Sequence, residues 1–322
     1  CIIRSVRTER AARKFALKED FTDIESNRKE VENILIPVAN PDTIEYLMNM
    51  ALVMKDSKRK NGLIALNVIN DDVESESKKA QGKRQLARAA SIGAAVDVKV
   101  ETVARFDLNI TSGILHTLQE YNASEIIIGL HRKANLMDSF LGTMTENLLK
   151  ATRRQLMIVK CLIPVNTLRR IVVAVPSKAE FEPGFSKWVE RICRMGRNLS
   201  CKIYFHVHAE TMPYLKGYVD KNYPSIRVEY IDFPDWDDLL LLSSEVNHDH
   251  LLVVVSARRG YISFKPSFDR LPMQLMKYFN ENSFIVVYPD EISFSEPRRH
   301  AKVQQYTNLL VGLNKLFNNK KK

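Results

Sequence analysis

Short apolar runs alternate with longer amphipathic stretches along most of this chain. The first run, Asn33–Ala39, reads NILIPVA, and a helix-like stretch from Thr43 to Met54 follows it. A strand that is buried on both faces of a parallel sheet is apolar at nearly every position, so such runs predict central strands. Strands and helices that alternate in this way build a parallel, doubly wound α/β sheet, because crossovers between parallel strands are right-handed.

The first half of the chain predicts five strands that alternate with four helices. The strands fall at Asn33–Ala39, Leu63–Ile69, Val96–Val103, Glu125–Leu130 and Leu156–Cys161, and the helices at Thr43–Met54, Gln81–Ala95, Asn109–Tyr121 and Met144–Arg153. In an open sheet of this type, ligands bind at the carboxyl ends of the strands where the winding reverses. Here those are the first and fourth strands.

The second half repeats this pattern, which indicates an internal duplication at the scale of a domain. Its strands fall at Arg170–Val175, Lys202–His208, Arg227–Ile231, His250–Ser256 and Ser283–Tyr288, and its helices at Phe185–Leu199, Thr211–Asn222, Trp236–Val246 and Pro272–Phe279. The predicted fold is therefore two doubly wound, five-stranded parallel sheets in tandem. The predicted segments are a helical lead-in (1–32), a first domain (33–161), a linker (162–168), a second domain (169–290) and a C-terminal helix (291–322).

One loop of the first domain carries the clearest functional pattern. Gly129 ends the fourth strand, Arg132 follows after two residues, and Gly142-Thr143 opens the next helix after nine more. Glycine lets an anion approach the backbone, and the first turn of a helix offers free N–H groups and the positive end of its dipole. The pattern favours a phosphate-binding loop; the alternative is an ordinary strand-to-helix connection whose glycines serve packing.

The spacing resembles the nucleotide loop of the universal stress protein family, G-x2-G-x9-G-[ST], with Arg132 in place of the second glycine. The resemblance covers roughly residues 31–290, and it implies the Rossmann-like fold of that family in tandem. It further implies that ATP or another adenine nucleotide binds through Gly129, Arg132, Gly142 and Thr143. Arg132 would either hold a phosphate through bidentate hydrogen bonds or fill the space that the glycine leaves open.

The same resemblance makes predictions about adenine recognition and about pairing. Family members carry an aspartate near the adenine at the end of strand one, where this chain has Ala39. Single-domain members pair through their fifth strands, so a tandem chain can form the equivalent pair internally from Met157–Lys160 and Phe284–Tyr288. In the second copy Ser256 is expected to match Gly129, and Asp269-Arg270 to match Gly142-Thr143. An aspartate at a helix entry repels phosphate, so this domain is predicted to be structural or regulatory.

The net charge of +10 is concentrated at the two ends of the chain. Arg4, Arg7, Arg10 and Lys14 recur at helical steps, and the last residues include Lys320-Lys321-Lys322. Lys and Arg are enriched in segments next to a membrane span, and they are attracted to anionic lipid; a solvated helix face explains the first stripe equally well. The chain begins at Cys1 without an initiator Met, which suggests a piece of a longer protein. Val303 to Phe317 predicts an amphipathic helix.

Several other classes of function find little support in the sequence. No C-x-x-C spacing, zinc-protease motif, nucleophile elbow or complete Walker loop is present, and we expect no catalytic site. His206 and His208 alternate on a strand while His248 and His250 flank the next one, so a four-ligand zinc site is not expected. The basic ends lack an aromatic platform, and nucleic acid is not an expected partner. The four cysteines are expected to be reduced, and Cys193 and Cys201 are expected to be small packing residues.

The leading functional hypothesis joins these observations through a second resemblance. Some bacterial monovalent cation/proton antiporters carry tandem universal-stress-like domains as a cytosolic C-terminal tail, and this chain is similar to such a tail. The expected partners are a transmembrane transport domain of the same polypeptide, a second copy in a homodimer, and the anionic face of the bacterial inner membrane. The alternative is a free-standing tandem stress protein that binds ATP in the cytosol.

Overall fold

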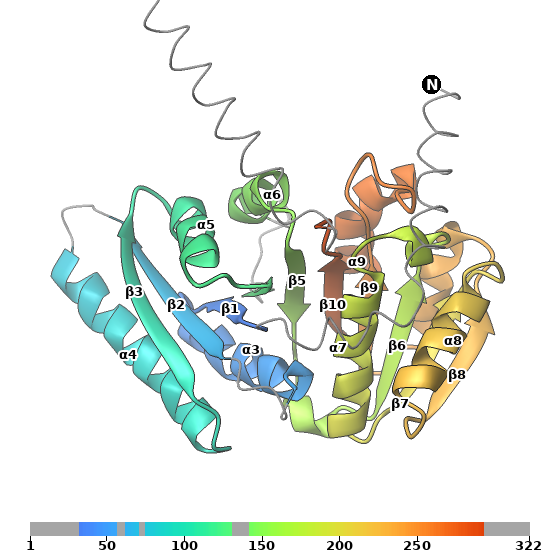
Figure 1. Cartoon of the computed structure of the whole chain (residues 1–322), viewed down its shortest axis with the longest axis horizontal. Coiled ribbons are helices and arrows are strands. Elements are labelled where there is room, and N and C mark those ends of the chain that lie inside the picture. Colours follow the sequence, from blue (N-terminus) through green and yellow to red (C-terminus); the bar gives the residue numbers. More distant parts are fainter. Residues whose placement is uncertain (1–31, 57–61, 71–74, 131–141, 293–322) are drawn as a thin grey trace, which may run out of the picture.

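The structure is a computed structural model, and it describes residues 32–56, 62–70, 75–130 and 142–292 (Figure 1). The strands in these residues form one continuous sheet in the order β3-β2-β1-β4-β5-β10-β9-β6-β7-β8. The predicted basic lead-in and the predicted C-terminal helix lie outside the described residues, apart from Glu32 at one end and Glu291 and Ile292 at the other. None of the helices in the described ranges combines the length and apolar character needed to span a bilayer.

The first half has the predicted alternation of strands and helices. Its elements are β1 (Ile34–Pro37), α3 (Pro41–Met54), β2 (Leu63–Asn70), α4 (Ser75–Ala94), β3 (Val100–Asp107), α5 (Ile110–Glu120), β4 (Glu125–Gly129), α6 (Gly142–Ala151) and β5 (Gln155–Lys160). All neighbouring strands in this half are parallel, and β1 lies between β2 and β4. The winding therefore reverses between β1 and β4, as the sequence predicts.

The second half repeats the strand order with more short helices. Its elements are η2 (Val165–Thr167), β6 (Arg170–Val175), η3 (Ala179–Phe181), α7 (Phe185–Asn198), β7 (Lys202–Val207), α8 (Met212–Asn222), β8 (Val228–Asp232), η4 (Trp236–Ser244), β9 (His250–Val255), η5 (Pro266–Arg270), α9 (Leu271–Tyr278) and β10 (Ser283–Tyr288), where η marks a 3-10 helix. The strands are again parallel, with β6 between β7 and β9.

The two five-stranded sheets join edge to edge. β5 and β10 pair antiparallel from Leu156–Tyr288 to Lys160–Phe284, with Ile158 opposite Val286 (Figure 1). Every residue of both strands is buried. The internal pairing that the family resemblance implied is therefore confirmed.

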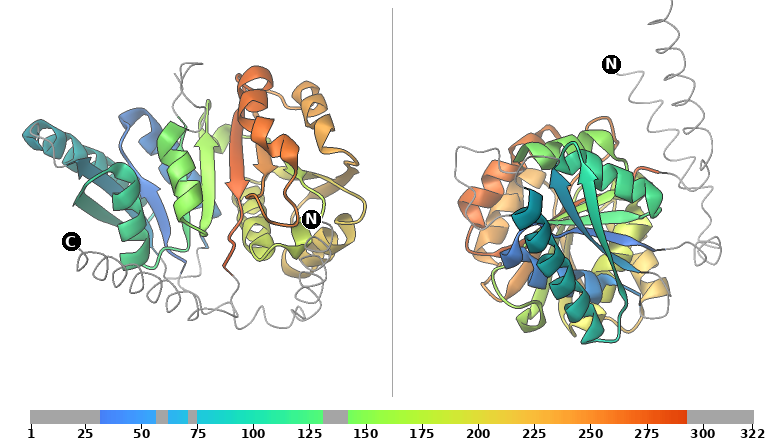
Figure 2. Two further views of the ribbon diagram at one scale, coloured as in Figure 1. Left: turned by 90° about the horizontal axis from the view of Figure 1, so that it is seen from above. Right: turned by 90° about the vertical axis from the view of Figure 1, so that its left-hand side faces the viewer.

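Helices cover both faces of the sheet (Figure 2, left). One face carries α3, α4, α7 and α8, and the other carries α5, α6, η4, η5 and α9. Each apolar core runs without interruption from the first half into the second, and fully buried side chains such as Trp188 and Phe279 anchor the two layers. The halves thus share their cores as well as their sheet.

Three element predictions differ from the structure. The helix expected from Gln81 begins at Ser75, and the strand expected at Val96–Val103 lies at Val100–Asp107. The later strand follows from the end of α4, where Asp97 takes a left-handed φ of 57° and the N–H of Val98 donates to Gly93 O. This is a Schellman-type helix end, which the sequence hides because Asp stands where Gly is usual. The third difference is that Trp236–Ser244 forms a 3-10 helix.

Candidate functional site

The predicted loop begins where Gly129 ends β4 against the start of α3. A side chain at Gly129 would place its Cβ 2.9 Å from Tyr46 Oη, 3.1 Å from Leu47 Cδ1 and 3.2 Å from Thr43 Cβ. The hydroxyl of Tyr46 donates to the carbonyl of Leu130 at 3.2 Å, directly after the strand. Gly129 therefore allows the first turns of α3 to lie on the end of β4, and the space beside it is filled by protein.

The far end of the loop begins α6. Gly142 has a φ of +67° there, which L side chains rarely adopt, and none of the described residues lies within 4 Å of the position where its Cβ would be. Thr143 is exposed in the first turn of this helix. The N–H groups there have no acceptor within the helix, and the dipole is positive at this end, so the position suits an anion. Arg132 lies outside the described residues, and its role stays a prediction.

The end of β1 differs from a nucleotide site with a carboxylate. Ala39 is exposed there, and its carbonyl accepts from Gln85 Nε2 at 2.8 Å. The preceding carbonyl of Val38 accepts from Asn67 Nδ2 at 2.8 Å, and the same amide group also donates to Gln85 Oε1. Two acceptors at the end of β1 are therefore already used by a pair of buried side-chain amides.

Local sequence pattern did not predict this amide pair, although one signal for it exists. Gly82 lies inside α4, where glycine is unfavourable. A Cβ at that position would lie 2.4 Å from Asn67 Oδ1. The glycine therefore makes room for Asn67, and a glycine inside a predicted helix can mark such a close approach.

The corresponding ends in the second half are built differently. β9 ends at Val255, and the next residue, Ser256, donates its N–H to Val287 O, just as Leu130 after Gly129 donates to Val159 O. The register thus matches Val255 to Gly129, which corrects by one residue the expected match with Ser256. Asp269 does not stand at the start of an α-helix; it lies in η5 and forms an exposed ion pair with Arg259 at 2.5 Å.

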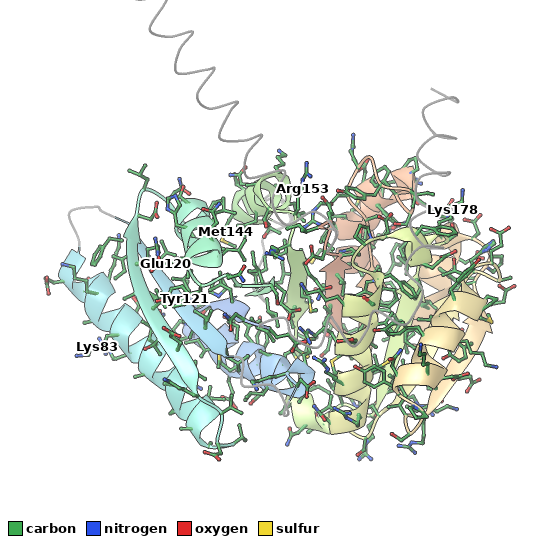
Figure 3. The ribbon with its side chains drawn as sticks, viewed as in Figure 1. Lys83, Glu120, Tyr121, Met144, Arg153 and Lys178 are labelled. Atoms are coloured by element: carbon green, nitrogen blue, oxygen red, sulfur yellow. The ribbon has the colours of Figure 1, made fainter. Side chains whose placement is uncertain are left out.

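An acidic connection replaces the short turn after the first strand of the half. In the first half, β1 leads through Asn40, the N-cap residue, into α3. In the second half, η3 intervenes between β6 and α7, and Lys178 has a left-handed φ of 67°. Glu182 in this connection accepts hydrogen bonds from Ser263 N and Oγ, and burial raises the pKa of both Glu180 and Glu182. Figure 3 marks Met144 on α6 and Lys178 on opposite sides of the β5–β10 pair.

A buried charge cluster joins the two halves on the face that carries α3 and α7. Arg191 of α7 is 1% exposed and bonds Glu125, which is fully buried at the start of β4, and Glu32 at 3.0 Å. Arg194 bonds the same Glu32 at 3.0 and 3.1 Å. Burial opposes the charge of Arg191, but Glu125 and Glu32 together raise its pKa above the ordinary value. The local sequence pattern does not predict this cluster, because its residues are far apart in the chain.

The histidines do not converge on a metal site within the described residues. No group of three or more His, Cys, Asp or Glu side chains there could hold an ion. His206 is buried against Phe233, with Nε2 3.5 Å from Glu245, and burial lowers its pKa. The side chains of Cys161, Cys193 and Cys201 are buried.

Comparison with known proteins relates the chain to two groups. Residues 30–160 match the universal stress protein family. The chain is 22% identical over 175 residues to the Na(+)/H(+) antiporter NhaS5 of Synechocystis sp. (strain ATCC 27184 / PCC 6803 / Kazusa), a match that covers 50% of this chain and only 25% of the antiporter.

Two solved structures show the same fold at low identity. The cytoplasmic domain of a prokaryotic cation chloride cotransporter is 12% identical, with a TM-score of 0.55 over 81% of this chain and 97% of that one. A universal stress protein from Archaeoglobus fulgidus DSM 4304 is 15% identical, with a TM-score of 0.54 over 81% and 98%. Residues 30–160 therefore resemble a universal stress protein domain, and the second half of the chain repeats the fold of the first.

Proposed function

We propose that this chain is a cytosolic regulatory region of a membrane monovalent cation/proton antiporter. The observation that carries the proposal is the 175-residue match to an antiporter in a chain whose residues 30–160 match the universal stress protein family. The fold of the cotransporter's cytoplasmic domain adds support, because it covers 81% of this chain. On this proposal the region senses a ligand or partner at the inner face of the bacterial membrane and has no catalytic role.

The way in which the chain enters the fold supports a coupling role. Glu32, the first described residue, is held by Arg191 and Arg194 of the second half rather than by its own half alone. Residues 1–32 would connect this point to a transport domain, and their basic charge would favour the membrane surface. A ligand regulates the transporter only if its affinity differs between two transporter states. Because the two halves share one sheet and both cores, a ligand-induced shift in either half would reach Glu32 through the whole region.

The proposed ligand is an adenine nucleotide bound by the first half. The open glycine start of α6 fits a phosphate, with Gly142 and Thr143 offering backbone N–H groups and Arg132 a guanidinium. The end of β1 fits the base less well, because Ala39 carries no carboxylate and its carbonyl is already bonded. We therefore expect the phosphates to dominate the affinity.

Nucleotide binding is tested by calorimetry with ATP, ADP and cyclic nucleotides on the purified chain. Gly142→Leu should abolish saturable binding, because it blocks the helix start. Gly260→Leu is a matched control, since Gly260 also has a positive φ (+96°) and no described residue within 4 Å of its would-be Cβ, but lies in the second half. Binding that both variants lose equally, or that neither loses, contradicts the proposed site.

The regulatory role is tested in the complete antiporter, in inverted membrane vesicles that report cation-driven proton exchange. Removing residues 33–322 should change the dependence of the rate on pH or cation concentration and leave the choice of cation unchanged. A complete gene that encodes no membrane spans would refute this proposal. It would favour a free-standing tandem stress protein, which the fold match over 98% of the Archaeoglobus protein supports as the second candidate.

A further inference from the structure

Among the described strands, only β3 and β8 leave a sheet edge unpaired. The fifth strands, through which a single domain could pair, are already joined as β5 and β10. β3 is eight residues long, whereas β8 has five. In the right-hand view of Figure 2, α4 and α5 stand on either side of β3, and no described element crosses in front of it. An open edge of this length is a template for pairing with another strand.

Large apolar side chains are exposed at both ends of this edge. Phe106 is 53% exposed and Leu108 is 89% exposed at its carboxyl end, and Val96 is 57% exposed before its amino end. Exposed apolar groups that come together when two chains meet favour an interaction site. In an antiparallel pair of two β3 strands, the two ends of the strand would lie side by side.

The side chains of β3 alternate between the two faces of the sheet. Phe106 lies under Lys79 of α4, whereas Arg105 bonds Glu120 and Asp107 bonds His116, both on α5. Figure 3 marks Glu120 at the end of α5 and Lys83 on α4. Even-numbered residues therefore face α4 and odd-numbered residues face α5. In an antiparallel pair related by a twofold axis, residues directly opposite each other share a face, so only even with even and odd with odd can pair.

We propose that β3 pairs antiparallel with β3 of a second copy of this chain, with Val103 opposite Val103 on the twofold axis. This register joins the exposed ends of one strand to those of the other and places opposite charges together. The directly opposed residues are Lys99 with Asp107, Glu101 with Arg105, Val100 with Phe106, Val98 with Leu108, and Thr102 with Ala104. Each of these pairs occurs twice in the dimer, and together the two sheets become one.

The neighbouring registers are disfavoured by charge. Moving the axis to Thr102 places Lys99 opposite Arg105, and moving it to Ala104 places Glu101 opposite Asp107. Like charges directly opposite each other destabilise a strand pair, and opposite charges stabilise it. A one-residue slip would turn every side chain to the wrong face. Among these registers, the one centred on Val103 satisfies both conditions.

The other open edge lacks this self-complementarity. Pairing β8 with itself about Tyr230 places Glu229 opposite Ile231 and Val228 opposite Asp232. Moving the axis to Glu229 or to Asp232 brings that acidic residue opposite its own copy. Because β3 is self-complementary in charge and β8 is not, we place the dimer contact at β3.

The proposal is tested by sedimentation with two variants, Glu101→Arg and Arg105→Glu. Each variant alone places like charges opposite each other twice, and should weaken the dimer by roughly tenfold or more. An equimolar mixture should form heterodimers, because a strand with a cation at both positions then faces a strand with a carboxylate at both. Circular dichroism confirms that each variant is folded before mixing. A mixture that stays monomeric, with both variants folded, overturns the proposal.

A cysteine cross-link tests the register itself. In a Cys1→Ser background, Val103→Cys should form a disulfide-linked dimer on oxidation, since directly opposed Cβ atoms lie about 4.5–5.5 Å apart. Ala104→Cys is the matched control, because Ala104 faces Thr102 and its own copy lies farther away. Equal cross-linking of both variants contradicts the register. The dimer is also tested with the wild-type chain at millimolar concentration. A monomeric chain whose β3 amides are protected from hydrogen exchange by another segment of the same chain overturns the dimer.

Discussion

The two halves share strand order, sheet and cores, yet they differ where their central strands end. The first half places Gly129 at the end of β4, a capped helix start at Asn40, and the open Gly142 at the start of α6. The second half places Val255 at the matching end of β9 and adds Glu180 and Glu182 after β6. The first half thus has the glycines that the proposed anion site needs, whereas the second half has Val255 and two carboxylates at the corresponding strand ends.

A second asymmetry lies at the amino ends of the same strands. Glu125 begins β4 and pairs in register with Gln155, whereas the matching positions of the second half are Leu251 and Ser283. The charge at Glu125 is balanced by Arg191 from the other half. The duplication has thus kept the fold while one copy exchanged apolar packing for an ionic joint between the halves.

The greatest loss of stability should come from breaking that joint. Arg191→Ala leaves Glu125 fully buried without its cation, so the free energy of unfolding should fall by about 3–5 kcal/mol. The measurement is urea denaturation followed by circular dichroism. Lys202→Ala is the control: its ion pair with Glu229 is exposed (39% and 48%), so its loss should cost far less than the loss of Arg191. The double variant Glu125→Leu/Arg191→Met, which imitates the apolar second half, should recover most of the loss; equal losses in single and double variants would contradict this account.

The next largest loss of stability is expected from a substitution that makes the end of β4 resemble the end of β9. Gly129→Val introduces the residue found at the matching position of β9, and its Cβ meets Tyr46, Leu47 and Thr43. Overpacking of this kind should cost about 1–3 kcal/mol. Thermal unfolding measures it, and Gly217→Val is the control, because it adds the same side chain at a position where no described residue lies within 4 Å of the new Cβ. An equal loss of stability in both variants would show that α3 moves away from the new side chain at little energetic expense.

A smaller effect is expected where both halves use left-handed glycines. Gly142→Ala and Gly260→Ala should each lose about 1–2 kcal/mol of stability, because an L side chain is strained at φ of +67° and +96°. Denaturant unfolding measures the loss. If only Gly142→Ala also changes nucleotide affinity, the functional difference between the halves gains support. If the two variants do not differ in affinity, the proposed functional difference is wrong.

The weakest effect is a pH dependence that belongs to the second half. Burial raises the folded-state pKa of Glu182 above its ordinary value of 4.5, so the folded state binds this proton more tightly than the unfolded state. Stability should therefore fall as the pH rises from about 4.5 through the raised folded pKa, by on the order of 1 kcal/mol for each pH unit that separates the two pKa values. Chemical denaturation across this pH range measures the fall.

The matched variant for this pH dependence is Glu182→Gln. It keeps an acceptor for Ser263 and should flatten that part of the stability curve. Burial also raises the pKa of Glu180 and Glu291 and lowers that of His206 and His250, so these groups contribute to the remaining slope. If the dependence of stability on pH is unchanged in Glu182→Gln, other titratable groups cause the whole dependence.

Much of the fold follows from local pattern. The continuous apolar runs at Ile34–Pro37 and His250–Val255 predict buried parallel strands. The structure has strands there, because the backbone of a buried strand can form its hydrogen bonds only with neighbouring strands. The end of α4 could not be predicted, since an Asp with a left-handed φ carries no local signal. Of the candidate site, Gly142 is where the pattern placed it, whereas the Asn67–Gln85 amide pair depends on two elements that meet only in the folded chain.

The duplication, the alternation of strands and helices in each half and the glycine start of α6 could be read from the amino-acid sequence, because each depends on spacing along one stretch of chain. How the halves meet was settled only in the folded molecule: which buried carboxylates Arg191 neutralises, which acceptors at the end of β1 are taken, and which edge of the sheet stays open. Those outcomes depend on contacts between residues far apart in the chain, and no local periodicity encodes them.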